Sequence, residues 1–212
     1  MRFNPVLNQE GLQVLPYLKK LPEGFYLSGG TALALQIEHR ISIDFDFFSP
    51  QSFDTQKLFT MLSFDIFADL KLTIIQEAED TLDVLTANQV KISFLTYRYP
   101  TVYPLIQTPY FKVADQLDIG ASKLVAITQR ASQKDYFDIF FILQQFSLEK
   151  LFEVAEKKYP TFNPVLYLKA LSYFEDCDSA TPQLVSTTVS FDEVKQELTT
   201  EAQTLFKKLS ST

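Results

Sequence analysis

The chain has 212 residues, 46% of them hydrophobic, which permits a well-packed core in one large domain or two small ones. Its formal charge of −7 argues against a broad nucleic-acid-binding surface but not against a local basic cluster. The single cysteine, Cys177, excludes an internal disulfide, and no stretch approaches the roughly 20 apolar residues that span a bilayer, so we expect a cytoplasmic protein with no membrane segment.

The N-terminal half mixes helix and strand patterns. Helical spacing predicts helices at about residues 6–19, 31–39 and 55–62. Strand composition or apolar alternation predicts strands at residues 25–28, 43–48, 71–76, 81–86 and 90–96. These elements predict a mixed β-sheet with flanking helices.

The C-terminal half is helical in pattern, and it follows a turn-rich stretch at residues 97–109. Helices are predicted at residues 115–130, 134–145, 148–158, 164–174 and 191–209, with breaks at Pro160 and Pro182. We therefore expect an α+β protein with an α/β core over residues 1–109 and a C-terminal helical bundle over residues 110–212.

The glycine pair Gly29 and Gly30 lies between the predicted strand at 25–28 and the helix that follows. Glycine lets the backbone approach a phosphate closely, and a helix N-terminus directs N–H groups at it. Thr31 is either a further phosphate ligand or a helix cap. A glycine pair alone is a weak signal, because strand–turn–helix junctions often need glycine for steric reasons.

The next predicted strand, in the sequence ISIDFDFF, contains two carboxylates. Alternation places Asp44 and Asp46 on one face and Phe45 and Phe47 on the other. Residues two apart on a strand are about 6.6 Å apart at Cα, so both carboxylates can bind one cation or a pair. Oxygen ligands suit Mg²⁺, which usually shares its ligands with a substrate phosphate. The alternative is an edge strand with a solvated acidic face.

Two basic residues, His39 and Arg40, lie in the segment between the glycine pair and the carboxylates. His39 is the only histidine, and its place near the predicted helix end favours capping or packing over catalysis. Arg40 is a candidate phosphate ligand, with a structural pair to a carboxylate such as Asp44 as the alternative.

The segment SGGTALALQIEHRISIDFDFF resembles the opening motif of the AbiEii/AbiGii nucleotidyltransferase toxin family, part of the DNA polymerase beta-like nucleotidyltransferase superfamily. A second block, DIGASKLVAITQRASQKDYFDIFFIL at residues 118–143, is similar to that family's later helical motif, in which a lysine is followed by an arginine and then a Lys-Asp pair. The two blocks cover about a quarter of the chain.

The resemblance implies a Mg²⁺-dependent enzyme that transfers a nucleotide from an NTP to an acceptor hydroxyl. It also implies the toxin of an abortive-infection or toxin–antitoxin system, with tRNA or another RNA as acceptor and an antitoxin as partner. The predicted catalytic residues are Asp44, Asp46, Lys123 and Asp135, the first two as metal ligands. The predicted nucleotide-binding residues are Gly29, Gly30, Thr31, Arg40, Arg130 and Lys134.

Lys123, Arg130 and Lys134 are spaced so that one uninterrupted helix would present them on a single face, suited to a triphosphate. The alternatives are a solvated basic stripe or local pairing of Lys134 with Asp138. Asp135 is either a further acidic site residue or a helix-start carboxylate favoured by the helix dipole.

One feature departs from the superfamily. Its enzymes often have a third carboxylate on a neighbouring strand, but the strand VKISFLTY has Ser93 there, and Asp83 is a weak substitute. The base that deprotonates the acceptor is therefore unidentified. This leaves open a catalytically impaired nucleotide-binding or interaction module, or a nucleotidyltransferase that acts on a protein or small molecule.

Overall fold

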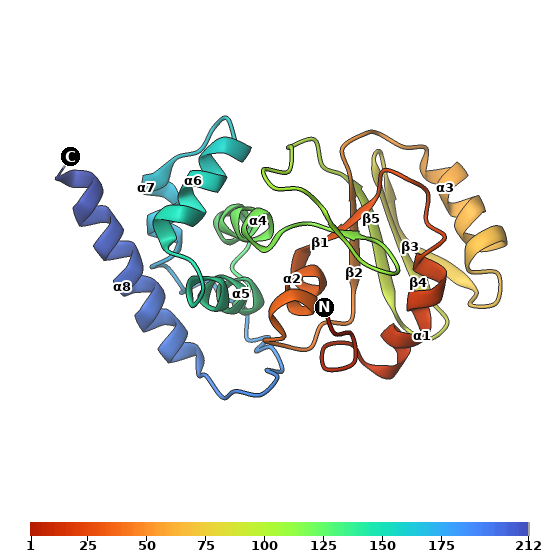
Figure 1. Ribbon diagram of the computed structural model, residues 1–212, viewed down its shortest axis with the longest axis horizontal. Helices are drawn as coiled ribbons and strands as arrows, with labels where there is room; N and C mark the ends of the chain where they lie inside the picture. The colour runs from red at the N-terminus through yellow and green to blue at the C-terminus, as the bar shows by residue number, and fades with distance from the viewer. Residues whose placement is uncertain (212) are drawn as a thin grey trace. The chain divides into compact units, whose positions relative to one another are not determined.

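The computed structural model describes residues 1–211, which form two compact units. The first is Met1–Asp115 and the second begins at Gln116 (Figure 1). Within the described residues, no helix is both long and apolar enough to cross a membrane.

The first unit combines helices with a β-sheet. Its helices are α1 (Gln9–Leu18), α2 (Gly29–Ile37), α3 (Thr55–Met61) and the π-helical turn η1 (Leu62–Ile66). Its strands are β1 (Tyr26–Ser28), β2 (Phe45–Ser49), β3 (Leu72–Ala78), β4 (Thr81–Thr86), β5 (Lys91–Thr96), β6 (Ile106–Gln107) and β7 (Lys112–Val113). The two-residue strands β6 and β7 were not predicted from the sequence.

The strands form one mixed sheet in the order β3-β4-β5-β2-β1-β7-β6. β2 pairs antiparallel with β1 and parallel with β5, and β1 pairs parallel with β7. In Figure 1, β1 and β2 lie together with α2 beside them. The mixed sheet with helices, followed by a helical unit, confirms the predicted α+β fold class.

One face of the sheet forms the core of the first unit. Phe45 and Phe47 of β2 are directly beside Ile92 and Phe94 of β5, and all four are fully buried. The rings of Phe47 and Phe94 stack with their centroids 5.7 Å apart. Burying each such phenylalanine contributes about 1.5–3 kcal/mol to the free energy of folding. Because phenylalanines and carboxylates alternate along β2, this contribution determines which face of the strand is buried.

The second unit is helical. Its helices are α4 (Gln116–Gln129), α5 (Gln133–Leu143), α6 (Leu148–Lys158), α7 (Pro164–Ala170) and α8 (Phe191–Ser210). Ser190 is the N-cap of α8 and forms a capping box with Glu193, which satisfies main-chain groups at the helix start. Helix α7 ends four residues before the predicted boundary at 174.

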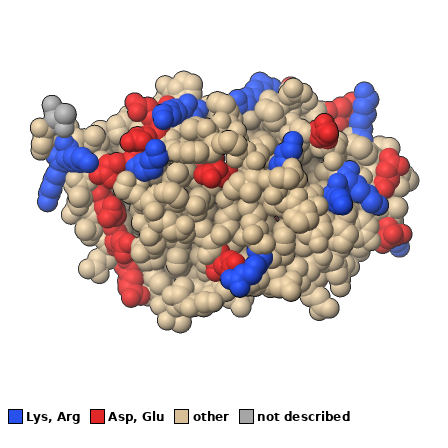
Figure 2. All heavy atoms as spheres, in the orientation of Figure 1, with Lys and Arg blue, Asp and Glu red and all other residues tan. Residues whose placement is uncertain are grey.

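A row of acidic side chains follows α8 (Figure 2). The helix has Glu193, Glu197 and Glu201 at four-residue spacing, which places them on one side. The side next to this row is apolar, since Val194, Leu198, Ala202 and Leu205 are buried. This acidic row accounts for part of the net negative charge and is unsuited to binding a polyanion.

Candidate functional site

The turn between β1 and α2 requires glycine at its first position. Gly29 has φ +68°, in the left-handed region where side chains are disfavoured. A Cβ atom on Gly29 would lie 2.8 Å from Oδ2 of Asp46. The absence of a side chain therefore lets the Asp46 carboxylate lie against the backbone at the start of α2.

The second glycine makes room for a guanidinium group. A Cβ atom on Gly30 would overlap with Nη2 of Arg40. Arg40 is buried, and its Nη1 donates a hydrogen bond to the main-chain oxygen of Ile41 at 3.1 Å. The glycine pair thus places an acidic and a basic side chain against consecutive residues at one helix N-terminus.

Asp44 directly precedes β2 and is exposed, whereas Asp46 lies inside the strand and is partly buried. Thr31 of α2 is buried, and its hydroxyl hydrogen-bonds the main-chain oxygen of Asp44 and lies 2.8 Å from Oγ of Ser42. The helix-cap alternative for Thr31 is wrong, because Ser28 occupies the N-cap position. Thr31 instead fixes the backbone that precedes the two carboxylates.

Four polar residues form a row across the sheet, on the face opposite the phenylalanine core. Ser28, Asp46, Ser93 and Asp83 are cross-strand neighbours on β1, β2, β5 and β4. Ser93 is therefore directly beside Asp46, at the position where superfamily enzymes often have a third carboxylate. Asp83 is one strand further away and forms an ion pair with Nζ of Lys91 at 2.7 Å.

Asp44 and Asp46 supply the oxygen donors that a hard divalent cation prefers. Within residues 1–211, no group of three or more His, Cys, Asp or Glu side chains is arranged to hold a metal ion. The donor set fits a cation that takes its other ligands from substrate phosphates and water, as Mg²⁺ commonly does.

The second sequence block forms a buried charge cluster in the helical unit. Nζ of Lys123 lies 2.6 Å from Oδ1 of Asp135 and 2.7 Å from Oδ2 of Asp138. All three side chains are buried. Nε of Arg130 donates to Oδ2 of Asp135 at 3.1 Å, although the Arg130 side chain is 69% exposed. Asp135 thus accepts hydrogen bonds from both Lys123 and Arg130.

Lys123, Arg130 and Lys134 do not share one helical face, because the uninterrupted helix that this would require is not formed. Helix α4 ends at Gln129 and α5 begins at Gln133, so Lys123 and Lys134 lie on different helices. Lys123 is buried inside the charge cluster, while Lys134 is exposed. Sequence reasoning also missed that Asp138 is a partner of Lys123. Its spacing of three residues from Asp135 was the available signal, because that spacing places both carboxylates on one side of α5.

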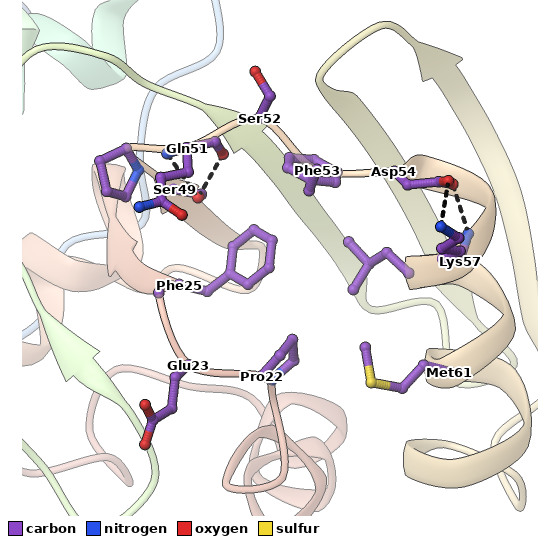
Figure 3. A pocket seen from close by; sticks show the side chains of 13 residues that line it. Pro22, Glu23, Phe25, Ser49, Gln51, Ser52, Phe53, Asp54, Lys57 and Met61 are labelled. Carbon is purple, nitrogen blue, oxygen red and sulfur yellow. Dashed lines mark hydrogen bonds and ion pairs between the residues drawn. The ribbon is translucent and has the colours of Figure 1, made fainter.

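The first unit also has a cavity of about 380 Å³ at the other end of β2, beside Ser49 (Figure 3). Phe25, Phe53 and Met61 are among its apolar lining residues. Asp54, another lining residue, caps α3 by accepting a hydrogen bond from the main-chain N–H of Lys57. This mostly apolar cavity lacks paired carboxylates, so the row containing Asp46 remains the better candidate for metal and phosphate chemistry.

Comparisons with known proteins identify a matching family and similar folds. A family model described as "Nucleotidyl transferase AbiEii toxin, Type IV TA system" matches residues 17–206. An uncharacterised protein of Aquifex aeolicus is 35% identical over 165 residues, which cover 72% of this chain and 74% of that protein.

Two solved structures have a similar fold. MenT4, a nucleotidyltransferase toxin from Mycobacterium tuberculosis, has a TM-score of 0.61 and 16% identity, with 92% of this chain and 86% of that chain covered. JHP933 from Helicobacter pylori has a TM-score of 0.55 and 19% identity, with 97% of this chain and 95% of that chain covered. At these identities the likeness concerns the fold.

Proposed function

Because the chain belongs to the AbiEii nucleotidyl transferase toxin family and is a nucleotidyltransferase, we propose that it transfers a nucleotide from Mg²⁺-bound NTP to a hydroxyl of an RNA acceptor such as tRNA. The main support from this chain is the contact of Asp46 with Gly29 and of Arg40 with Gly30. This arrangement joins a carboxylate, a guanidinium and a helix N-terminus in one place.

We propose that the β- and γ-phosphates bind at the start of α2. The main-chain N–H groups of the first helical turn have no partners within the helix, and the helix dipole favours an anion there. The guanidinium of Arg40, which lies against Gly30, adds positive charge at the same helix end. Thr31 contributes by holding the Asp44 backbone through its hydroxyl.

Asp44 and Asp46 would hold Mg²⁺, which when bound offsets negative charge on the phosphates. In the transfer, the acceptor hydroxyl oxygen forms a bond to the α-phosphorus, and the bond from that phosphorus to the β-phosphate oxygen breaks. The hydroxyl proton passes to a base, and pyrophosphate leaves with the bonding electrons. Ser93, beside Asp46, is a poor base because its hydroxyl is not acidic enough to exist as an alkoxide.

We propose that Lys123 and Asp135 are catalytic and that Arg130 and Lys134 bind the nucleotide, as the resemblance implies. The exposed side chains of Arg130 and Lys134 are accessible to phosphates. The buried pairing of Lys123 with Asp135 gives both charged groups a fixed position, which a catalytic role requires. Removing one member would leave an uncompensated buried charge.

We further propose that the protein acts in the cytoplasm as the toxin of an abortive-infection or toxin–antitoxin system and that a cognate antitoxin protein binds it. An RNA acceptor requires local basic residues despite the net charge of −7. Labelling of RNA should therefore decrease steeply as the salt concentration rises.

The test is transfer of label from each α-labelled NTP, with Mg²⁺, to separated RNA and protein fractions. The Asp46→Asn variant should lose RNA labelling by at least about 100-fold, because it removes a metal ligand. Asp65→Asn is the matched control, since Asp65 is an exposed carboxylate of η1 in the same unit. Equal labelling by wild type and Asp46→Asn would refute the site, and label in the protein fraction alone would refute the RNA acceptor.

One alternative has a specific observation behind it. The serine beside Asp46, in place of a third acid, favours a nucleotide-binding module that retains the fold without turnover. In that case calorimetry would show Mg²⁺–NTP binding that Asp46→Asn weakens, while no RNA, protein or small-molecule fraction would gain label.

A further inference from the structure

Three aromatic side chains continue the sheet face that contains Asp46. Phe48 follows Asp46 by two residues on β2, so both side chains are on the same face. The main-chain N–H of Tyr97 donates to the oxygen of Ser49 at 2.7 Å, which extends the pairing of β5 with β2 beyond Thr96. We call Phe48, Tyr97 and Tyr99 the aromatic strip.

The neighbouring side chains show that residues 93–98 alternate between the two faces of the sheet. Along β5, Ser93 is beside Asp46 and Leu95 is beside Phe48, so Tyr97 is next on that face. Arg98, between the two tyrosines, bonds instead to Asp80 at 3.0 Å and to Ser52 at 3.2 Å. The polar row and the aromatic strip are therefore consecutive parts of one face.

The rings of the strip contact one another and remain partly accessible. The centroids of Phe48 and Tyr97 are 4.8 Å apart, and those of Tyr97 and Tyr99 are 5.4 Å apart. Tyr26, the cross-strand neighbour of Phe48 on β1, is buried, and its ring centroid lies 6.1 Å from that of Phe48, so it packs against the side of the strip. Tyr99 is 43% exposed, in contrast to the fully buried phenylalanines of the opposite face.

We propose that the aromatic strip stacks the nucleobase of the NTP, an inference that rests on the proposed function. Two residues along a strand separate Asp46 from Phe48 by about 6.6 Å, so a nucleotide with its phosphates at Asp46 can reach the strip with its base. Base–aromatic stacking does not read the hydrogen-bonding edge of the base. All four NTPs should therefore bind, purines more tightly because their rings are larger.

The test compares two ligands that share the phosphates but not the base, Mg²⁺–ATP and Mg²⁺–tripolyphosphate, by isothermal titration calorimetry. Tyr97→Leu should weaken ATP binding by between about 5-fold and about 150-fold, the range found for loss of one stacked base, and leave tripolyphosphate binding unchanged. Tyr97→Phe should restore ATP binding, because the ring is retained.

Tyr110→Leu is the matched control. The Tyr110 ring contacts Phe3 at 5.3 Å and Phe111, which packs against the core phenylalanine Phe47 on the other face of the sheet. This variant should bind ATP as the wild type does. If Tyr97→Leu does not fold, as judged by thermal denaturation, Tyr99→Leu replaces it, because the exposed Tyr99 ring can be removed with less loss of packing.

Equal weakening of both ligands by the tyrosine variants, or no weakening of either, overturns the stacking proposal. If the wild type binds tripolyphosphate in an Asp46-dependent way and ATP no more tightly, the base subsite is wrong and the proposed function stands. If the wild type binds neither ligand, both proposals fail.

Discussion

Replacing Gly29 with alanine should damage the site more than the fold. At φ +68° an alanine costs about 1–2 kcal/mol of unfolding free energy. Its Cβ atom would also lie 2.8 Å from Oδ2 of Asp46, where ordinary contacts begin at 3.4 Å, so restoring an ordinary contact takes a movement of about 0.6 Å by the carboxylate or the backbone. Because a misplacement of about 1 Å costs on the order of 100-fold in rate, we expect nucleotide transfer to fall by about 10- to 100-fold.

Gly24→Ala is the matched control for backbone strain. Gly24 has φ +101°, also in the region that favours glycine, but a Cβ atom there would meet no atom within 4 Å. It lines the apolar cavity beside Ser49 and not the polar row. Urea denaturation should show comparable destabilisation in the two variants, while labelling assays should show loss of transfer in Gly29→Ala alone. Equal activity in both variants would refute the role assigned to the contact of Gly29 with Asp46.

The remaining predictions concern the charge cluster, a buried tyrosine and the cation. Lys123→Met should lower the unfolding free energy, measured by urea titration, by about 3–5 kcal/mol, because it leaves Asp135 and Asp138 buried without their shared cation. The control Lys208→Met, at an exposed lysine, should lower it by under about 1 kcal/mol. Equal losses in the two variants would contradict a stabilising role of the buried cluster. Burial raises the pKa of Tyr136 from its ordinary value of 10.0 to about 12, so its contribution to stability is complete below the unfolded pKa and is lost as pH rises through the folded pKa. Urea titrations between about pH 8 and 11.5 should show this alkaline loss in the wild type and not in Tyr136→Phe, and identical pH profiles would contradict it. Removing Mg²⁺ with EDTA should abolish labelling and added Mg²⁺ should restore it, whereas undiminished labelling in EDTA would rule out a metal held by Asp44 and Asp46.

The sequence predicted the fold class because the alternation in the carboxylate strand is strong. Phe45 and Phe47 could only face a core, so the orientation of Asp46 followed from the strand period. The strand with the carboxylates pairs with the strand that precedes the glycine pair, because one helix and a turn are enough to return the chain beside the first strand.

Other parts of the site depend on tertiary contacts that no local pattern contains. The burial of Arg40 against Gly30 requires the backbone after α2 to fold back on the helix start. The pairing of Lys123 with Asp138 requires α4 and α5 to pack against each other after a break at residues 130–132, and helical spacing does not reveal this packing. Spacing predicts which residues share an element, but not which elements bring their charges together.

The most direct test of nucleotidyl transfer measures pyrophosphate release and nucleotide incorporation in the same reaction. We expect one pyrophosphate for each nucleotide added to RNA, with both products absent in Asp46→Asn and unchanged in the exposed-carboxylate control Asp65→Asn. Release of orthophosphate without incorporation, or pyrophosphate release that Asp46→Asn leaves intact, would contradict it.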